Sequence, residues 1–172
     1  MNHFSRNQIS TQRIAEDSIG HSFNSLFGHY LTSEVQAIGV DEPYLIRKDE
    51  VLNLLVFTEL VVKRCRNLEY FQVATKSYGL NDFWYALKRD LEQRGIELNI
   101  VVTATVTVPK IVLSNGFIFE ISLGLHFFKA PNPTYSLGMR DYYFRKCKQT
   151  DVTIYRQIKT SPCKSSSSNC CE

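Results

Sequence analysis

The residue best suited by its type to chemistry on a phosphoester is His126, in the stretch GLHFFK. Its imidazole is a candidate nucleophile, although it stands in no recognised catalytic motif. Phe127 and Phe128 predict an apolar surrounding for it, and no second histidine lies nearby in sequence. His21 and His29 do not have metal-ligand spacing without further partners. No Ser-His-Asp order, glycine-rich phosphate loop or HExxH motif is present. The residues alone therefore indicate no enzyme, and we expect no metal or cofactor.

A predicted hairpin runs directly before this histidine, in PKIVLSNGFIFEISLGLHFFKAP, from Pro109 to Pro131. Two apolar runs rich in β-branched and aromatic residues flank Ser114, Asn115 and Gly116. Because a two-residue turn needs positive φ, which Asn-Gly adopts at low cost, the pattern predicts a tight turn. Such a hairpin either presents catalytic groups, as in phosphodiesterases, or frames a binding surface.

Length and composition predict one globular domain with loose ends. The chain has 172 residues, of which 44% are hydrophobic and 12% aromatic, enough for one sizeable core. It lacks the run of about 18 apolar residues that a membrane span needs, and its polar N-terminus does not resemble a signal peptide. We expect a soluble intracellular protein with a disordered lead-in (1–18), a domain (19–159) and a disordered Ser/Cys tail (160–172).

The five cysteines are odd in number and irregularly spaced, which predicts reduced thiols rather than a disulfide framework. Cys170 and Cys171 lie in the Ser-rich tail, where acylation is conceivable, but Asn169 stands where a C-a-a-X box would need a cysteine.

Hydrophobic periodicity predicts the elements that must position these groups. We expect helices over residues 22–31, 48–65 and 80–94, strands over 35–40, 68–75 and 97–108, the two arms of the hairpin, and two further strands between 134 and 155. Strands that alternate with helices and are then followed by a run of strands predict an α/β domain, with a mixed β-sheet flanked by helices.

Charge is distributed unevenly along the chain. Residues 1–50 carry four Lys/Arg against seven Asp/Glu, whereas residues 129–164 carry eight Lys/Arg against two Asp. The basic C-terminal third favours an anionic partner, either a membrane surface or nucleic acid. A solvated strand face explains the same residues equally well.

Several stretches together resemble a known family. HSFNSLFGHYL, DEPYLI, NLLVFTELVVKR, GLNDFWYALKRDLEQRGIELNI, SNGFIFEISLGLHFFKAP and SLGMRDYYFRKCKQTDVTIY come in the order and near the spacing of the C-terminal phospholipase D-like domain of MIT (microtubule-interacting and trafficking) domain-containing protein 1 and its relatives. The resemblance implies a fold similar to one half of a phospholipase D. It also implies a homodimer that binds acidic, phosphoinositide-containing membranes in the ESCRT pathway of late cytokinesis and abscission.

The sequence departs from this family in two ways. Fewer than 20 residues precede the matching region, too few for the MIT bundle that binds ESCRT-III tails, so we do not expect direct ESCRT-III contact. Phospholipase D chemistry uses H-x-K-x-x-x-x-D, with a His nucleophile, a Lys that stabilises the phosphoryl oxygens and an Asp. Aligned through the Asn-Gly turn, these positions hold Thr107, Pro109 and Ser114. Lys110 lies one place further and points to the opposite strand face.

The sequence therefore predicts a non-catalytic module, cytoplasmic and peripheral at membranes such as the midbody or late endosome. The cations expected to contact lipid are Lys110, Lys129, Arg145, Lys146 and Lys148, with Lys63 and Arg64 as second choices. Two alternatives remain: a phosphodiesterase or nuclease with a non-standard site at His126, completed across a dimer, and a scaffold that binds partners through the apolar helix at 51–62. Nucleic acid ranks last, because no recognition helix or exposed aromatic sheet motif supports it.

Overall fold

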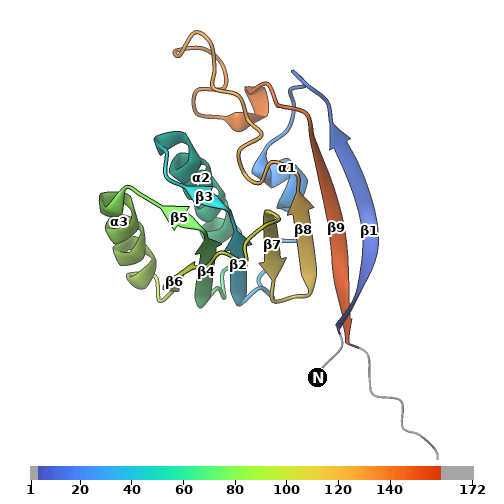
Figure 1. Ribbon diagram of the computed structural model, residues 1–172, viewed down its shortest axis with the longest axis vertical. Helices are drawn as coiled ribbons and strands as arrows, with labels where there is room; N and C mark the ends of the chain where they lie inside the picture. The colour runs from blue at the N-terminus through green and yellow to red at the C-terminus, as the bar shows by residue number, and fades with distance from the viewer. Residues whose placement is uncertain (1–3, 160–172) are drawn as a thin grey trace, which may run out of the picture.

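The computed structural model describes residues 4–159, so the predicted tail, with Cys163, Cys170 and Cys171, lies outside the described residues. A seven-stranded sheet in the order β1-β9-β8-β7-β2-β4-β6 runs through the domain, and β3 and β5 form a small second sheet (Figure 1). The strands are β1 (Phe4–Ile14), β2 (Ala37–Asp41), β3 (Tyr44–Leu45), β4 (Tyr70–Thr75), β5 (Ser77–Tyr78), β6 (Glu97–Val102), β7 (Lys110–Leu113), β8 (Phe117–Ile121) and β9 (Thr150–Lys159). The helices are α1 (Phe23–Phe27), α2 (Lys48–Arg64), α3 (Asn81–Glu92) and the 3-10 turn η1 (Tyr142–Phe144).

The sheet is mixed, which confirms the predicted architecture. β2, β4 and β6 are parallel and are joined through α2 and α3, whereas β7, β8, β9 and β1 pair antiparallel. The helix α2 begins at the predicted residue, Lys48. Glu50 accepts hydrogen bonds from the backbone N–H groups of Ile46 and Arg47, both at 2.8 Å, which satisfies donors that a helix start leaves free.

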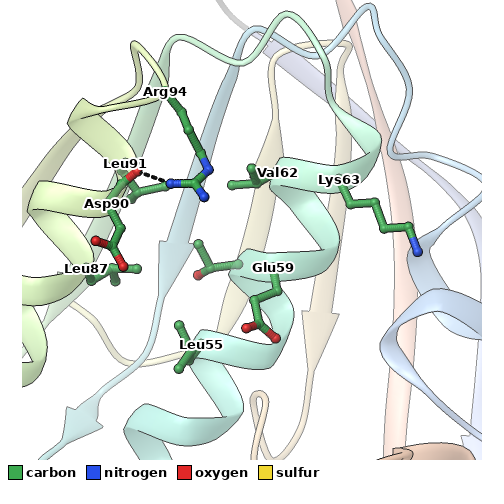
Figure 2. Close-up of a pocket in the computed structure, with 9 residues that line it drawn as sticks. Leu55, Glu59, Val62, Lys63, Leu87, Asp90, Leu91 and Arg94 are labelled. Atoms are coloured by element: carbon green, nitrogen blue, oxygen red, sulfur yellow. Dashed lines mark hydrogen bonds between the residues drawn. The ribbon is translucent and has the colours of Figure 1, made fainter.

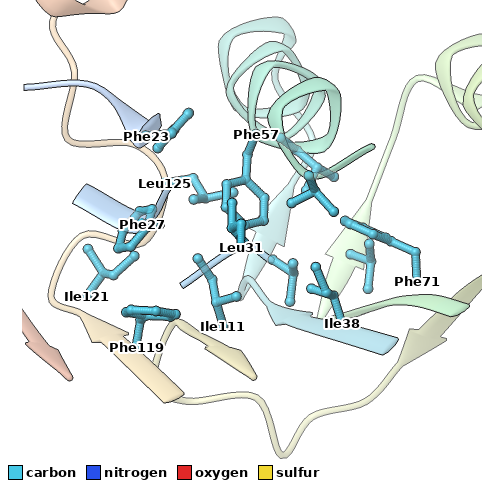
Figure 3. Packing of buried hydrophobic residues seen from close by; sticks show 14 of the residues in the cluster. Phe23, Phe27, Leu31, Ile38, Phe57, Phe71, Ile111, Phe119, Ile121 and Leu125 are labelled. Atoms are coloured by element: carbon cyan, nitrogen blue, oxygen red, sulfur yellow. The ribbon is translucent and has the colours of Figure 1, made fainter. Parts of the chain in front are cut away.

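The core lies between this sheet and its helices (Figure 3). Strand side chains alternate between the two faces of a sheet, and Ile38, Phe71 and Phe119 point toward α1 and α2. Phe27 of α1 packs edge-on against Phe119 and Phe57, with ring centroids 4.9 and 6.2 Å apart. The predicted apolar face of α1 is thus confirmed as core.

The other face of the sheet has no helix over it in the described part of the chain. The buried apolar side chains of α1, α2 and α3 all belong to the core cluster on the opposite side. Side chains on this open face are half-buried at most strand positions, among them Ala37, Gly39, Asp41, Tyr70, Gln72, Asn99, Lys110 and Val112. A parallel sheet usually has both faces covered, so this face is an unusual feature of the isolated chain.

The predicted hairpin is present as β7 and β8, but its turn differs from the expected one. Three residues, Ser114 to Gly116, separate the strands, and Gly116 alone has positive φ, at +95°. Asn115 instead donates from its side chain to the carbonyl of Tyr30, at 3.0 Å. The turn is therefore fastened to the chain just after α1 and needs left-handed backbone at the glycine only.

Two predicted stretches of strand end early. The strand expected over 97–108 stops at Val102, because its partner β4 ends at Thr75, the residue paired with Val102. Of the two strands expected between 134 and 155, only β9 forms. The other strand does not form, because the segment before β9 contains Pro131, Pro133 and Gly138. Proline lacks the N–H donor that a β-ladder needs, and glycine favours turns.

The expectation of disorder over residues 1–18 is wrong for β1. This strand pairs antiparallel with β9 from Phe4 opposite Lys159 to Ile14 opposite Thr150. Its residues from Ser5 to Arg13 are all exposed, so it has no apolar alternation for a sequence pattern to detect. Backbone pairing along the edge of β9, rather than side-chain burial, accounts for the strand.

Ser114 provides a test of how the hairpin turn is held. Its Oγ accepts hydrogen bonds from the backbone N–H groups of Gln36 and Ala37, at 2.9 and 3.1 Å. We expect Ser114→Ala to lower the free energy of unfolding, measured in urea, by about 1 kcal/mol, because two donors lose their acceptor. Thr107→Ala, at an exposed position, serves as the control and should change it by less than about 0.5 kcal/mol. Equal effects would contradict this role.

Candidate functional site

The three positions aligned with a phospholipase D motif do not form a site. Thr107 and Pro109 lie in the segment before β7, whereas Ser114 follows its far end. The five residue steps along β7 from Pro109 to Ser114 place them on the order of 17 Å apart at the usual strand rise. Thr107 is exposed, and Ser114 holds backbone N–H groups, so neither is placed to attack or activate a phosphoester.

Lys110 points onto the open face of the sheet, away from the helices, as its place in the strand predicts. Its Nζ lies 3.2 Å from Oδ2 of Asp41 on the neighbouring strand β2. This cation is therefore paired within the fold, at the end of the sheet where β8 finishes, since Lys110 lies opposite Glu120.

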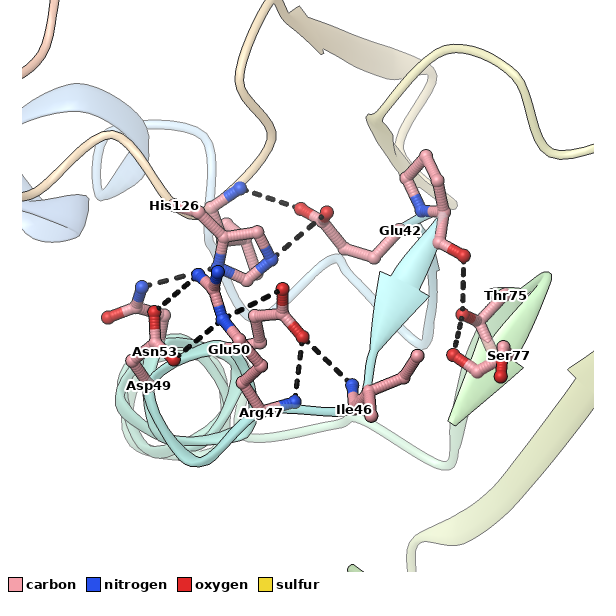
Figure 4. Close-up of polar contacts among 11 residues, drawn as sticks. Glu42, Ile46, Arg47, Asp49, Glu50, Asn53, Thr75, Ser77 and His126 are labelled. Carbon is pink, nitrogen blue, oxygen red and sulfur yellow. Dashed lines mark hydrogen bonds and ion pairs between the residues drawn. The ribbon is translucent and has the colours of Figure 1, made fainter. Parts of the chain in front are cut away.

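His126 lies in a polar cluster, and the apolar surrounding predicted for it is wrong (Figure 4). Its Nε2 is 3.3 Å from Oε2 of Glu42, and its Nδ1 is 3.2 Å from the side-chain nitrogen of Asn53. Oδ1 of Asn53 accepts from the hydroxyl of Tyr142 at 2.9 Å, and Oε1 of Glu42 accepts from the backbone N–H of Leu125 at 2.6 Å. Residues from β2, α2 and the segment after β8 meet in this cluster.

The cluster offers no free nucleophile. Nε2 of His126 is buried and makes no well-aligned hydrogen bond, and Nδ1 faces Asn53. Attack on phosphorus needs a ring nitrogen that reaches the substrate, and both nitrogens are directed into the fold. In the described residues no ion pair or hydrogen bond joins His126 to a lysine or arginine that could neutralise phosphoryl charge. The arrangement therefore supports a structural role that ties three segments together.

Besides Lys110, the fold itself uses two further predicted lipid contacts, and Lys129 is the first of them. It binds Glu16 and Asp17, in the segment after β1, and Nζ lies 2.9 Å from Oδ1 of Asp17. The hydrogen bond to Glu16 and then that to Asp17 hold the pKa of Lys129 above its ordinary value. Its charge is thus matched by two carboxylates before any lipid approaches.

Arg145 is the second. Its guanidinium lies 3.7 Å from the ring centroid of Tyr142, a cation–π distance. It also donates to the carbonyls of Gly138 and Met139, at 2.5 and 3.0 Å. Arg145 therefore holds the loop before β9 in place.

Three further cations of the segment between β8 and β9 are exposed. Lys146 and Lys148 lie on either side of the buried Cys147, so both side chains point outward, and Arg140 is exposed six residues earlier. None of the three takes part in an ion pair among residues 4–159. The sequence prediction named both lysines and missed Arg140.

Lys63 and Arg64 lie elsewhere. They end α2, which leads into the start of β4, whereas Lys146 and Lys148 lie in the segment that leads into β9. Lys63 is among the residues that line the groove between α2 and α3, and in Figure 2 the end of its side chain is directed away from Arg94. The structure therefore divides the predicted cations among separate surfaces.

Sequence reasoning also missed a group of exposed apolar residues in the loop between Pro131 and Arg145. They are Tyr135, Leu137, Met139, Tyr143 and Phe144. The sequence could have predicted their exposure, because Pro133, Ser136 and Gly138 in the same segment disfavour a strand. Apolar side chains in a segment that forms no strand do not cover a sheet face.

Other site types find no support in residues 4–159. No group of His, Cys, Asp and Glu there could hold a metal ion, and no helix there is long and apolar enough to cross a membrane. Cys65 and Cys147 are buried free thiols, as predicted, and burial raises the pKa of Cys65 to about 11.

The mixed sheet and its hairpin, taken with the sequence, define the class of this chain as a phospholipase D-like domain. Residues 20–156 match the sequence model of a family described as the phospholipase D-like domain at the C-terminus of MIT. The chain belongs to this family, as the resemblance implied.

One curated relative is mouse MIT domain-containing protein 1, which is 29% identical over 154 residues. The match covers 86% of this chain and 62% of the mouse protein, so the chain spans less than two thirds of that relative's length. Among solved structures, a phospholipase D family member, Nuc from Salmonella typhimurium, is similar with a TM-score of 0.48 at 12% identity. That match covers 87% of this chain and 84% of Nuc.

Proposed function

We propose that this chain is a non-catalytic phospholipase D-like module that associates, as a homodimer, with acidic, phosphoinositide-containing membranes. The observation that carries the proposal is that three cations of the segment between β8 and β9, Arg140, Lys146 and Lys148, are exposed and take part in no ion pair among residues 4–159. A cation near an anionic bilayer contributes about 1 kcal/mol, so binding depends on several acting together.

Membership of this family supports a place in an ESCRT-related pathway of cytokinesis, which the sequence resemblance implies. We accordingly propose a cytoplasmic location, peripheral at membranes such as the midbody or late endosome. Direct contact with ESCRT-III is not part of the proposal, because the matched family is the phospholipase D-like domain.

Charge reversal tests the membrane proposal. We expect Lys146→Glu/Lys148→Glu to weaken binding to phosphoinositide-containing vesicles by about 30-fold or more, since two contributions of about 1 kcal/mol are lost. Vesicle flotation over a protein titration measures the change, and binding by the unaltered chain should fall as salt rises.

The matched control is Lys63→Glu/Arg64→Glu. It makes the same change in net charge at the C-terminal end of α2. It should leave flotation close to that of the unaltered chain. If the two double variants weaken binding equally, net charge rather than this surface is responsible. If the unaltered chain does not float at all, the membrane proposal is wrong.

The direction of both ring nitrogens of His126 into the fold supports the non-catalytic part of the proposal. We expect a flat progress curve with a generic phosphodiester such as bis(p-nitrophenyl) phosphate, both for the unaltered chain and for His126→Ala. Turnover that the unaltered chain shows and His126→Ala lacks would support the phosphodiesterase alternative instead.

The open face of the sheet supports self-association. A second copy on this face would cover strands that parallel sheets normally bury, and a two-fold pair brings the same patch from each copy together. At the centre of the patch, Gly39 has little around it, because an added Cβ would meet only Val112, at 4.0 Å. Side chains of both charges, Asp41 and Lys110, lie at its border and suit an isologous contact.

The same glycine gives a variant that should fold and yet disrupt this contact. We expect Gly39→Arg to convert a dimer into a monomer in light scattering, because two guanidinium groups would be brought together at the two-fold contact. Tyr85→Arg, on the exposed side of α3, should leave the mass unchanged. A monomeric unaltered chain, or a dimeric Gly39→Arg variant with native circular dichroism, would contradict this interface.

A further inference from the structure

The loop between Pro131 and Arg145 presents large apolar side chains to water. It extends beyond the strand ends and stands out from the body of the domain (Figure 1, orange). Tyr135 is 87% exposed and Leu137 78%, the highest values among the large apolar residues of the described chain. Met139, Tyr143 and Phe144 are each more than 40% exposed.

This loop is held in shape by its own hydrogen bonds. The Ser136 hydroxyl donates to the carbonyl of Pro133 at 2.6 Å, and the Met139 N–H donates to the carbonyl of Ser136 at 3.1 Å. Gly138 has φ of +93°, and a Cβ there would come within 3.0 Å of Arg145, whose guanidinium caps the loop. Two exposed apolar tips are thus displayed by an ordered segment.

Single exposed apolar residues are common on protein surfaces and need no explanation, whereas a group of them marks an interaction site. Here five such residues lie within ten positions, and Arg140 and Lys146 lie among and beside them. An apolar tip beside cations matches a bilayer surface, where acyl chains lie beneath anionic headgroups. Tyrosine is also favoured at the membrane–water boundary, because its ring is apolar and its hydroxyl polar.

We propose that Tyr135 and Leu137 insert into the outer acyl region of an acidic membrane, while Arg140 and Lys146 contact lipid phosphates. The inference rests on the proposed membrane association and adds an apolar anchor to its charge attraction. A bilayer fits better than a protein groove, because the tip projects outward and neither tip residue lines any of the main surface pockets among residues 4–159. A lipid surface needs no matching shape, only apolar depth beneath negative charge.

Fluorescence of an introduced tryptophan tests the insertion directly. The native Trp84 is 4% exposed and gives a constant background. We expect Leu137→Trp in the full chain to show a blue-shifted emission on vesicles of phosphatidylcholine with phosphatidylserine and a phosphoinositide, and quenching by brominated acyl chains. Tyr85→Trp, at a 74% exposed position on α3, is the control and should show neither.

A second variant measures how much Tyr135 and Leu137 contribute to the affinity for vesicles. Tyr135→Ser/Leu137→Ser changes two side chains that the fold does not bury, so folding should be unaffected. We expect it to weaken sedimentation with these vesicles about tenfold or more, and to make the remaining binding more sensitive to salt, because only the charge attraction is left.

The outcomes separate the two proposals. If the unaltered chain does not bind vesicles, membrane association fails and the inference fails with it. If the unaltered chain binds, but the serine variant binds equally and the emission of the Leu137→Trp variant is not quenched, insertion is wrong and the charge-based proposal stands. If the serine variant binds vesicles normally but loses self-association in light scattering, the loop is a contact between protein copies and insertion is overturned.

Discussion

Strand side chains alternate between the two faces of the sheet, and in the described part of the chain helices cover one face only, which determines where the strand side chains lie. The aliphatic and phenylalanine side chains that face α1, α2 and α3 form the core, and the alternate residues form the open face. Lys110 follows directly from this rule. It belongs to the open face, where it pairs with Asp41. The hairpin keeps its backbone arrangement with Thr107, Pro109 and Ser114 at the positions aligned with the motif.

The helices were predictable because burial leaves a period in the sequence. α2 begins at the expected Lys48 and ends at Arg64, one residue before the expected end. β1 left no such trace, since its residues from Ser5 to Arg13 are exposed on both faces and its stability comes from pairing with β9. For the loop before β9, the sequence predicted a strand that does not form. Its tyrosines and phenylalanine favour strand, but no neighbouring strand offers it a ladder, and its apolar side chains remain in water.

The candidate sites could be predicted only as far as local sequence decides them. The substitution of the motif positions is visible in the sequence, but the partners of the cations and of His126 are not. Lys129 meets Glu16 and Asp17 across 113 and 112 positions, and Glu42 meets Leu125 across 83. From the sequence, the neighbouring Phe127 and Phe128 predict an apolar setting for His126. The fold instead brings the buried carboxylate of Glu42 to its ring. Contacts between distant segments depend on the sheet order, which the sequence pattern left undetermined.

The open face and the exposed loop are compatible with each other because they belong to different sides of the domain. The base of the loop packs through Tyr142 against Phe23 of α1, with ring centroids 6.0 Å apart, on the helix-covered side of the sheet. A second copy seated on the open face would leave this loop uncovered, so each dimer would carry two apolar tips and two sets of exposed cations. Weak sites joined in this way reinforce one another when both can reach the same surface, because the second contact becomes intramolecular. In the proposed dimer, a two-fold axis normal to the bilayer would meet that condition, and self-association would then raise membrane affinity without any added lipid contact in either copy.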